Sequence, residues 1–300
     1  MTRTHFVAAL VAALALACPL VGRGSAAPGV DLAGSSNRLG FDLQRALRGQ
    51  AGNFAFSPAS IFVALVMPWS GARGATATEM GRVLHLDAAP DAVLPQASAL
   101  LGRLHDPQRT AYTLRVANRL FAERSYTFEK PYLDRMAAFG APTERVDFRG
   151  AAEAARGRIN GWVEQETAGR IKDLVPGGAV NTETRLALVN AIYMLAEWAQ
   201  PFTAEATQPR PFYAGGTTAR DVPTMRQLGS FSYAEAPGLQ VLEMPYRGGE
   251  LAMTILLPRE RAGLGALESR LDAAQLAAHV AALKPERVSI LLPKFTVDPP

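Results

Sequence analysis

Asn190 is the residue that most constrains the fold, because it lies inside the apolar run from Leu186 to Ala196. The β-branched and aromatic content of this run predicts a strand that is covered on both faces. A carboxamide in such a strand needs hydrogen-bond partners, since leaving it unpaired costs roughly 1–3 kcal/mol. Ser57 and Ser60, at the start of a predicted helix, are the candidate partners. The pattern predicts a sheet that polar contacts hold shut against a helix start.

Composition indicates an ordinary globular protein. The chain has 300 residues, of which 48% are hydrophobic and 19% are charged, so it can bury a core. The formal charge is +4, and Arg3 and Arg23 in the N-terminal leader contribute two of these charges. The remaining charge, about +2, is too small to indicate a nucleic-acid or anionic-membrane partner. We therefore expect neither partner.

The N-terminus has the pattern of an export signal. Arg3 precedes an apolar stretch over residues 6–17 that is too short to span a bilayer. Small residues then allow cleavage after Ala26, so we expect residues 1–26 to be a signal peptide and the protein to be secreted, to a periplasm or to the medium. Cys18, the only cysteine, lies at the wrong distance from the preceding leucine for a lipoprotein signal. The mature chain would then contain no disulfide.

Helical and strand periodicities alternate without a fixed rhythm, which predicts one α+β domain. The expected helices cover residues 37–47, 58–67, 75–84, 91–104, 129–139, 152–163 and, in two pieces, 264–283. The expected strands cover residues 53–56, 112–121, 144–148 and 186–196, a hairpin over 240–246 and 250–257, and 288–295. Ser57 and Pro58 form a helix-start pattern, with a capping residue followed by proline at the first helical position.

Motifs for catalysis and for metal binding are missing. His85, His105 and His279 do not form a metal-spacing pair, and Cys18 lies in the leader. We find no nucleophile elbow, no S-x-x-K motif, no phosphate loop and no dinucleotide fingerprint. We therefore expect no metal, no cofactor and no enzymatic activity. An exported serine hydrolase remains an alternative interpretation, because serines are present even though none has a partner in sequence.

Several motifs, in order along the chain, resemble the serpin family of serine protease inhibitors. The matching segments are residues 53–61, 64–65, 71–76, 159–163, 167–175, 188–193, 198–212, 241–246, 253–258 and 292–295. Each segment alone is weak, whereas the whole series at the family's spacing is specific. The resemblance extends from about Asn37 to the end of the chain.

The resemblance implies a serpin-like α+β fold over residues 31–300, with eight to nine helices packed on three mixed or antiparallel sheets. It implies three groups of site residues: a shutter that controls opening of the large sheet, a breach where a reactive loop enters that sheet, and a helix that lies across it. The shutter residues are Ser57, Ser60 and Asn190, the breach residues are Trp198 and Thr207, and the helix residues are Ile159, Asn160, Trp162 and Val163.

The family mechanism is a trap for a serine protease, or a cysteine protease in some members. The protease cleaves an exposed reactive loop, which inserts into the sheet as a new strand while the protease stays attached. This chain reaches Pro300 before the hinge, the reactive loop and the strand that carries the family's shutter histidine, so we expect these 300 residues alone to be inactive. We expect a monomer, and no heparin site because the helix near Arg103 lacks a basic run. A non-inhibitory serpin-like binding or structural protein is the main alternative.

Overall fold

The computed structural model describes residues 5–7, 12–13, 29–49, 52–104, 108–214 and 218–297. These residues belong to two compact units. The helical unit comprises residues 24–39 and 58–195, and the sheet unit comprises residues 1–23, 40–57 and 196–300. Most of the expected signal peptide, and also His105, lie outside the described residues. The helix α1 (Leu32–Leu47) contains the boundary between the two units.

A three-stranded sheet organises the helical unit, with the order β4 (Thr143–Val146), β3 (Tyr112–Glu123), β5 (Leu186–Ala196). β3 and β4 are parallel, and Leu120 of β3 lies opposite Thr143 of β4. All three strands were expected from the alternation and composition of their residues. Within the described part of the chain, β5 is an edge strand of this sheet.

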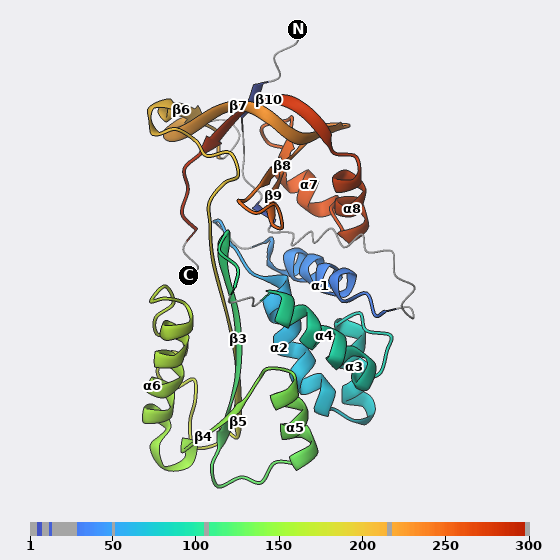
Figure 1. Ribbon diagram of the computed structural model, residues 1–300, viewed down its shortest axis with the longest axis vertical. Helices are drawn as coiled ribbons and strands as arrows, with labels where there is room; N and C mark the ends of the chain where they lie inside the picture. Colours follow the sequence, from blue (N-terminus) through green and yellow to red (C-terminus); the bar gives the residue numbers. More distant parts are fainter. Residues whose placement is uncertain are drawn as a thin grey trace. The chain divides into compact units, whose positions relative to one another are not determined.

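Helices cover both faces of this sheet (Figure 1). The helices of the unit are α2 (Pro58–Gly71), α3 (Gly74–Val83), α4 (Pro90–Leu104), α5 (Lys130–Ala138) and α6 (Phe148–Glu166). α6 lies on one face, while α2, α4 and α5 lie on the other. Pro58 is the first helical residue of α2, as the sequence predicts, because its missing N–H needs no partner there.

The strand β5 is less buried than its apolar sequence predicts. Val189 and Ala191 are buried, but Leu195 is 58% exposed and Asn190 is only partly buried. Helices lie over both faces of the sheet, but most side chains of β5 are only partly buried, so the strand is less buried than expected. Within the described residues β5 has a neighbouring strand on one side only, which leaves the side chains along its other side partly exposed.

The sheet unit is built around one larger sheet. Its strands are β6 (Gln208–Phe212), β7 (Arg220–Ala236), β8 (Leu239–Pro245), β9 (Ala252–Pro258) and β10 (Lys284–Pro293), together with the short strands β1 (His5–Val7) and β2 (Ala12–Ala13). The order is β1-β10-β7-β8-β9-β2, and β6 pairs with β7. The short helices η1 (Ala204–Ala206), α7 (Leu264–Arg270) and α8 (Ala273–Ala281) complete the unit. The expected hairpin corresponds to β8 and β9, and the expected two-piece helix to α7 and α8.

The strand β7 was not predicted, and it accounts for the number of sheets. It is 17 residues long, pairing with β6 and β10 over one part and with β8 over its end. It therefore joins β6, β8 and β10 in one hydrogen-bonded sheet, so the described residues form two sheets where three were expected. The α+β class and its eight α-helices agree with the expected fold.

Two further details concern the segment before α2 and the character of the helices. The expected strand over residues 53–56 is not formed; these residues are extended without strand pairing, and the rings of Phe54 and Phe56 stack with centroids 6.0 Å apart. Among the described residues, no helix combines the length and the apolar character needed to cross a membrane.

Candidate functional site

The carboxamide of Asn190 has hydrogen-bond partners at both ends. The Ser60 hydroxyl on α2 donates to its Oδ1, and its Nδ2 donates to Asn118 Oδ1 on β3 at 2.7 Å. Asn118 is only 6% exposed, so this polar chain links α2, β5 and β3 within one unit. The structure thus brings together Ser60 and Asn190, two of the three predicted shutter residues. Ser57 directly precedes α2 and belongs to the sheet unit, and its role in the shutter stays a prediction.

Asn118 is a member of this network that sequence reasoning missed. It lies in a strand whose alternate residues Tyr112, Leu114 and Leu120 are buried, and Asn118 occupies the same face. A carboxamide at a buried position of an alternating strand is the signal that could have identified it. The sequence alone, however, does not show that its side chain lies within hydrogen-bond distance of Asn190.

A buried carboxylate anchors the start of α6 to the end of β3. Glu123 is fully buried and accepts hydrogen bonds from the Ser125 hydroxyl at 2.6 Å and the Ser125 backbone N–H at 3.0 Å. It also accepts from the N–H groups of Phe148 at 2.7 Å and Arg149 at 3.1 Å, in the first turn of α6. These bonds, led by the Ser125 hydroxyl, lower the pKa of Glu123 to about 2, although burial acts in the opposite direction.

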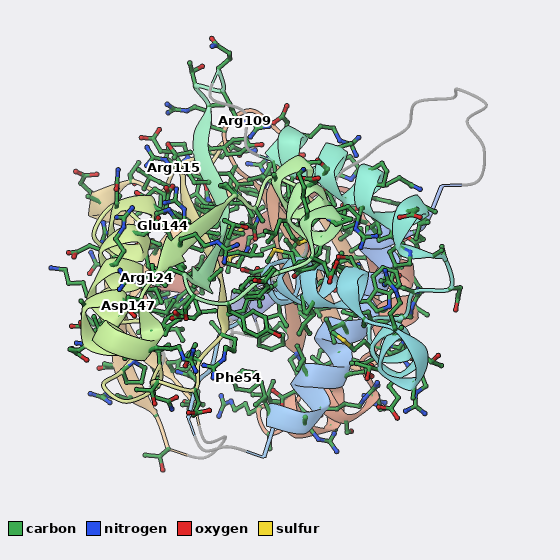
Figure 2. The ribbon with its side chains drawn as sticks, turned by 90° about the horizontal axis from the view of Figure 1, so that it is seen from below. Phe54, Arg109, Arg115, Arg124, Glu144 and Asp147 are labelled. Carbon is green, nitrogen blue, oxygen red and sulfur yellow. The ribbon has the colours of Figure 1, made fainter. Side chains whose placement is uncertain are left out.

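A second carboxylate joins the middle of α6 to the sheet. Glu144 on β4 is 2.7 Å from Arg119 on β3 and 2.6 Å from Arg158 on α6. The Arg119 guanidinium also lies 5.2 Å from the ring centre of Trp162, which packs against the same sheet. Burial raises the pKa of Glu144, but hydrogen bonds from Arg158 and Arg119 outweigh it, so its pKa lies below the ordinary value. Arg124 and Asp147, labelled with Glu144 in Figure 2, form a further ion pair of 2.7 Å.

The predicted sheet-covering helix is α6, and its apolar face is buried as expected. Ile159, Trp162 and Val163 pack into the core cluster that includes Phe121 of β3. Asn160 makes polar contacts instead, since its Nδ2 donates to the Val175 carbonyl at 3.0 Å and its Oδ1 accepts from the Val175 N–H at 2.9 Å. This paired contact fastens the segment that follows α6 back onto the helix.

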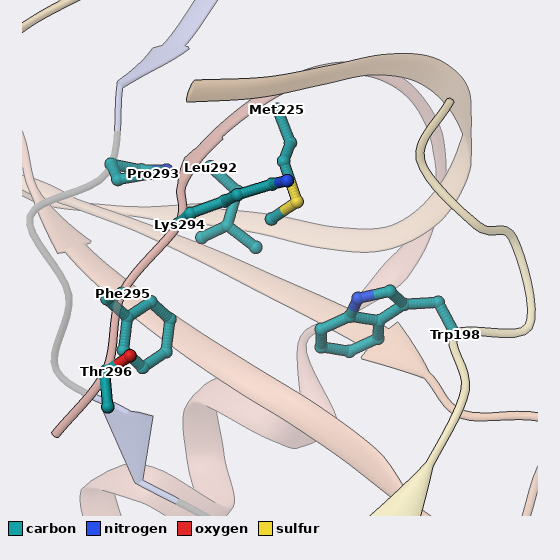
Figure 3. Close-up of a pocket in the computed structure, with 7 residues that line it drawn as sticks. All are labelled: Trp198, Met225, Leu292, Pro293, Lys294, Phe295 and Thr296. Atoms are coloured by element: carbon teal, nitrogen blue, oxygen red, sulfur yellow. The ribbon is translucent and has the colours of Figure 1, made fainter. Parts of the chain in front are cut away.

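Trp198, the predicted breach tryptophan, lies in the sheet unit. Its ring stacks on Tyr246 with centroids 4.5 Å apart, and the two residues form an isolated β-bridge. A cavity of about 440 Å³ lies beside it, lined by Trp198, Met225, Leu292, Pro293, Lys294, Phe295 and Thr296. Figure 3 shows Trp198 and Phe295 on opposite sides of this cavity. Thr207, the other predicted breach residue, ends η1 and donates its N–H to Ala204; its breach role stays a prediction.

Among the described residues, no group of three or more His, Cys, Asp or Glu side chains is placed so that it could hold a metal ion. The Ser35 hydroxyl donates to the backbone carbonyl of His85, at 2.8 Å. A backbone carbonyl cannot accept the serine proton during nucleophilic attack as an imidazole would. This contact therefore gives no catalytic pair.

Comparison with known families gives one clear match. The model of the family described as "Serpin (serine protease inhibitor)" matches residues 34–299. An uncharacterized serpin-like protein of Thermococcus kodakarensis is 42% identical over 264 residues, covering 87% of this chain and 61% of that protein. Human Serpin B3 is 36% identical, and the leukocyte elastase inhibitor of Xenopus tropicalis is 37% identical; the matches cover 89% of this chain and 74% and 73% of these proteins.

Solved structures agree with the sequence matches. The ovalbumin of emu superposes with a TM-score of 0.84 at 31% identity, covering 87% of this chain and 73% of the ovalbumin chain. A structure titled "Cleaved Serpin 42Da" gives a TM-score of 0.81 at 32% identity, covering 87% of this chain and 71% of that chain. The chain therefore spans between about three fifths and three quarters of the length of these relatives.

Proposed function

The chain belongs to the serpin family, and from this premise we propose that it provides the framework of an inhibitor that traps serine proteases by inserting a reactive loop into its sheet. The family is one of protease inhibitors rather than enzymes, so the chain is not assigned a catalytic activity. The observation that carries the proposal is the hydrogen-bond chain from Ser60 through Asn190 to Asn118, which links β5 to α2 and β3.

In this mechanism the sheet parts, and the backbone N–H and C=O groups of the inserting loop pair with the strands on either side of it. Polar bonds that link the edge strand to a helix must rearrange when the sheet parts, so they control how easily it opens. The network at Asn190 has the position that this role requires, on the edge strand and against the helix start.

We propose that the 300-residue chain alone does not inhibit a protease, because it offers no bait peptide bond. To test the framework, we would build a chimera that continues after Pro300 with the C-terminal remainder of the Thermococcus kodakarensis relative, from the point where the match ends.

The experiment incubates the chimera and the 300-residue chain with trypsin, chymotrypsin and an elastase, followed by denaturing gel electrophoresis. We expect a protease complex that resists denaturation for the chimera with at least one protease, and none for the 300-residue chain. A complex formed by the 300-residue chain would contradict the proposed need for the loop. Cleavage of the chimera without any complex would favour a non-inhibitory serpin-like binding or structural protein instead.

We further propose that the protein is exported and that signal peptidase cuts after Ala26. The support is the sequence pattern of residues 1–26, with a basic start, a short apolar stretch and small residues before the cut. Mass spectrometry of the protein from expressing cells tests this: a mature N-terminus at Ala27 is expected, and an intact leader on the cellular protein would refute it.

A further inference from the structure

Four arginines share one face of the sheet formed by β6, β7 and β10. Residues directly opposite each other in a pair of strands point to the same face. Arg226 lies opposite Leu291, and Arg287 lies opposite Ser230. Arg210 lies opposite Val222, and Arg220 lies opposite Phe212. Because residues 220, 222, 226 and 230 are all an even number of positions apart along β7, the four arginines form one stripe, here called the arginine stripe.

The arginine stripe lies on the outer face of the sheet rather than on the core face. The alternate residues Val288, Ile290 and Leu292 of β10 belong to the core cluster of this unit. On the stripe side, Arg220, Arg226 and Arg287 are exposed. Measured along β7 at the usual rise per residue, the stripe extends over about 33 Å from position 220 to position 230. The intervals between successive positions 220, 222, 226 and 230 are about 7, 13 and 13 Å.

None of these four guanidinium groups has an ion-pair partner among the described residues. The face itself, from residue 220 to residue 230 of β7 and the positions opposite, contains no carboxylate. The nearest carboxylate on this face is that of Glu243 on β8, which lies opposite Ser232, beyond the end of the stripe. Burial raises the pKa of Glu243. Ion pairs are made by many other arginines of this chain, such as Arg158 with Glu144 and Arg259 with Glu235. The stripe therefore concentrates positive charge that the fold does not neutralise.

Apolar surface and a small cavity lie between these charges. Leu228 is 56% exposed between Arg226 and Ser230. A cavity of about 100 Å³ is lined by Arg210, Pro211, Phe212, Thr224, Leu291 and Pro293. The Nε of Arg210 is buried without a hydrogen-bond partner, so none of the described residues fixes this side chain through that atom. A guanidinium at the wall of an apolar hollow suits a carboxylate on a short carbon chain.

We propose that the arginine stripe is a docking surface for an acidic segment of a partner protein, with one of its carboxylates bound by Arg210. Charge complementarity selects an acidic partner, and the apolar side chains between the arginines favour a peptide over a nucleic acid. Binding of single strands generally uses exposed aromatic rings for base stacking, and Phe212, the aromatic ring of this face, is partly buried at the cavity. This proposal is argued from side chains of β6, β7 and β10 alone and does not rest on the inhibitory mechanism.

The docking uses side chains rather than strand addition. β6 is the outer strand next to β7, and it contains Pro209 and Pro211. Each proline removes a backbone N–H donor, which makes this edge a poor template for another strand. The partner is therefore expected to lie across the face of the sheet, with its carboxylates spaced along the stripe.

The test measures binding of a fluorescent peptide of about ten residues, enough to span the stripe, in which glutamate alternates with leucine or phenylalanine. The variant R220Q/R226Q/R287Q removes three exposed charges of the stripe. The matched control R82Q/R149Q/R170Q removes three exposed arginines of the other unit that also have no ion pair among the described residues. We expect the stripe variant to weaken binding by at least about tenfold and the control by less than about twofold, with the wild-type affinity falling as salt rises.

Two further measurements keep the proposal falsifiable. R210K retains the charge but loses the planar fork, so we expect it to weaken binding several-fold. Oligothymidylate of equal charge is the competing ligand. Absence of peptide binding, equal losses in the stripe variant and the control, or tighter binding of oligothymidylate than of peptide would each overturn the proposal. Thermal unfolding checks that the triple variant folds, and R226E replaces it if it does not.

Discussion

At Asn190 one carboxamide uses its oxygen and its nitrogen for two different elements. It accepts from Ser60 on α2 and donates to Asn118 on β3. An amide side chain is suited to this position because it can donate at one end and accept at the other, which an aspartate or a leucine cannot do. The single residue thereby couples the helix start to two strands of the sheet.

Replacing Asn190 by alanine leaves the side chains of Ser60 and Asn118 without their common partner. Since Asn118 is buried, we expect N190A to lower the free energy of unfolding by roughly 1–3 kcal/mol, measured by urea denaturation. The double variant N190A/N118A provides the control. Removal of both partners should cost less than the sum of the single changes, with a coupling above about 0.5 kcal/mol. Strictly additive costs would show that the two side chains do not interact.

The need for partners at Asn190 could be predicted from its apolar neighbours, and so could Ser60 from its helix-start pattern. Asn118 could not be chosen, because several polar residues of the chain lie in alternating strands and only the pairing of β3 with β5 brings this one close. The roles of Glu123 and Glu144 also depend on contacts across the fold. Local sequence does not show whether either carboxylate is buried or which groups it binds.

Glu123 predicts a pH dependence of stability. Its pKa in the folded protein is about 2, below the ordinary value of 4.5, so its contribution is present above the unfolded-state pKa and is lost as pH falls toward 2. We expect E123Q to be less stable than the wild type at pH 7, and its stability to change less between pH 5 and pH 2. Urea denaturation at a series of pH values measures both. Exposed Glu79 gives the matched control E79Q, which should retain the wild-type profile.

At the scale of elements, two polar contacts hold α6 on its sheet and a third joins it to the segment that follows. Glu123 binds its first turn, Glu144 binds Arg158 in its middle, and Asn160 binds the segment beyond its end. In the proposed mechanism a new strand enters this sheet, so we expect the strength of these contacts to affect how readily the sheet expands. The apolar stripe of α6 could be predicted from sequence, whereas these polar contacts could not.

The contact of Glu144 with Arg119 and Arg158 can be tested through local motion of α6. In E144Q both arginines lose their carboxylate, and we expect faster amide hydrogen exchange across α6 with a global stability loss of about 1 kcal/mol or less. Raising the salt concentration should accelerate exchange in the wild type more than in E144Q, because screening acts on the ion pairs. Unchanged exchange in E144Q would mean that apolar packing alone holds the helix. E153Q, which affects a pair within α6, is the control.

The strands β6 and β7 illustrate where sequence reasoning fails at this scale. β7 contains Gly229, several serines and charged residues, a composition that is unfavourable for a buried strand. Its two ends face different neighbours, so no single alternation runs through all 17 residues. β6 contains two prolines, which argue against a strand unless it lies at an edge, as it does here. In both strands, long-range pairing outweighs the local preference.

At the scale of the whole molecule, membership of the serpin family connects these features. The described chain contains the strand β5, a polar network that links it to α2, and a helix across the sheet. In the proposed mechanism, segments after Pro300 supply the reactive loop, its hinge and a further strand. The central proposal is that the sheet of β5, once completed by these segments, accepts the cut loop as one more strand and becomes more stable.

The most direct test of this claim is the melting temperature of the chimera before and after a protease cuts within its reactive loop. If the cut loop inserts beside β5, the added strand pairing and burial should raise the melting temperature, because each kcal/mol of added stability shifts it by roughly 2–4 °C in domains of 150–250 residues. An unchanged or lower melting temperature after complete cleavage would contradict the claim.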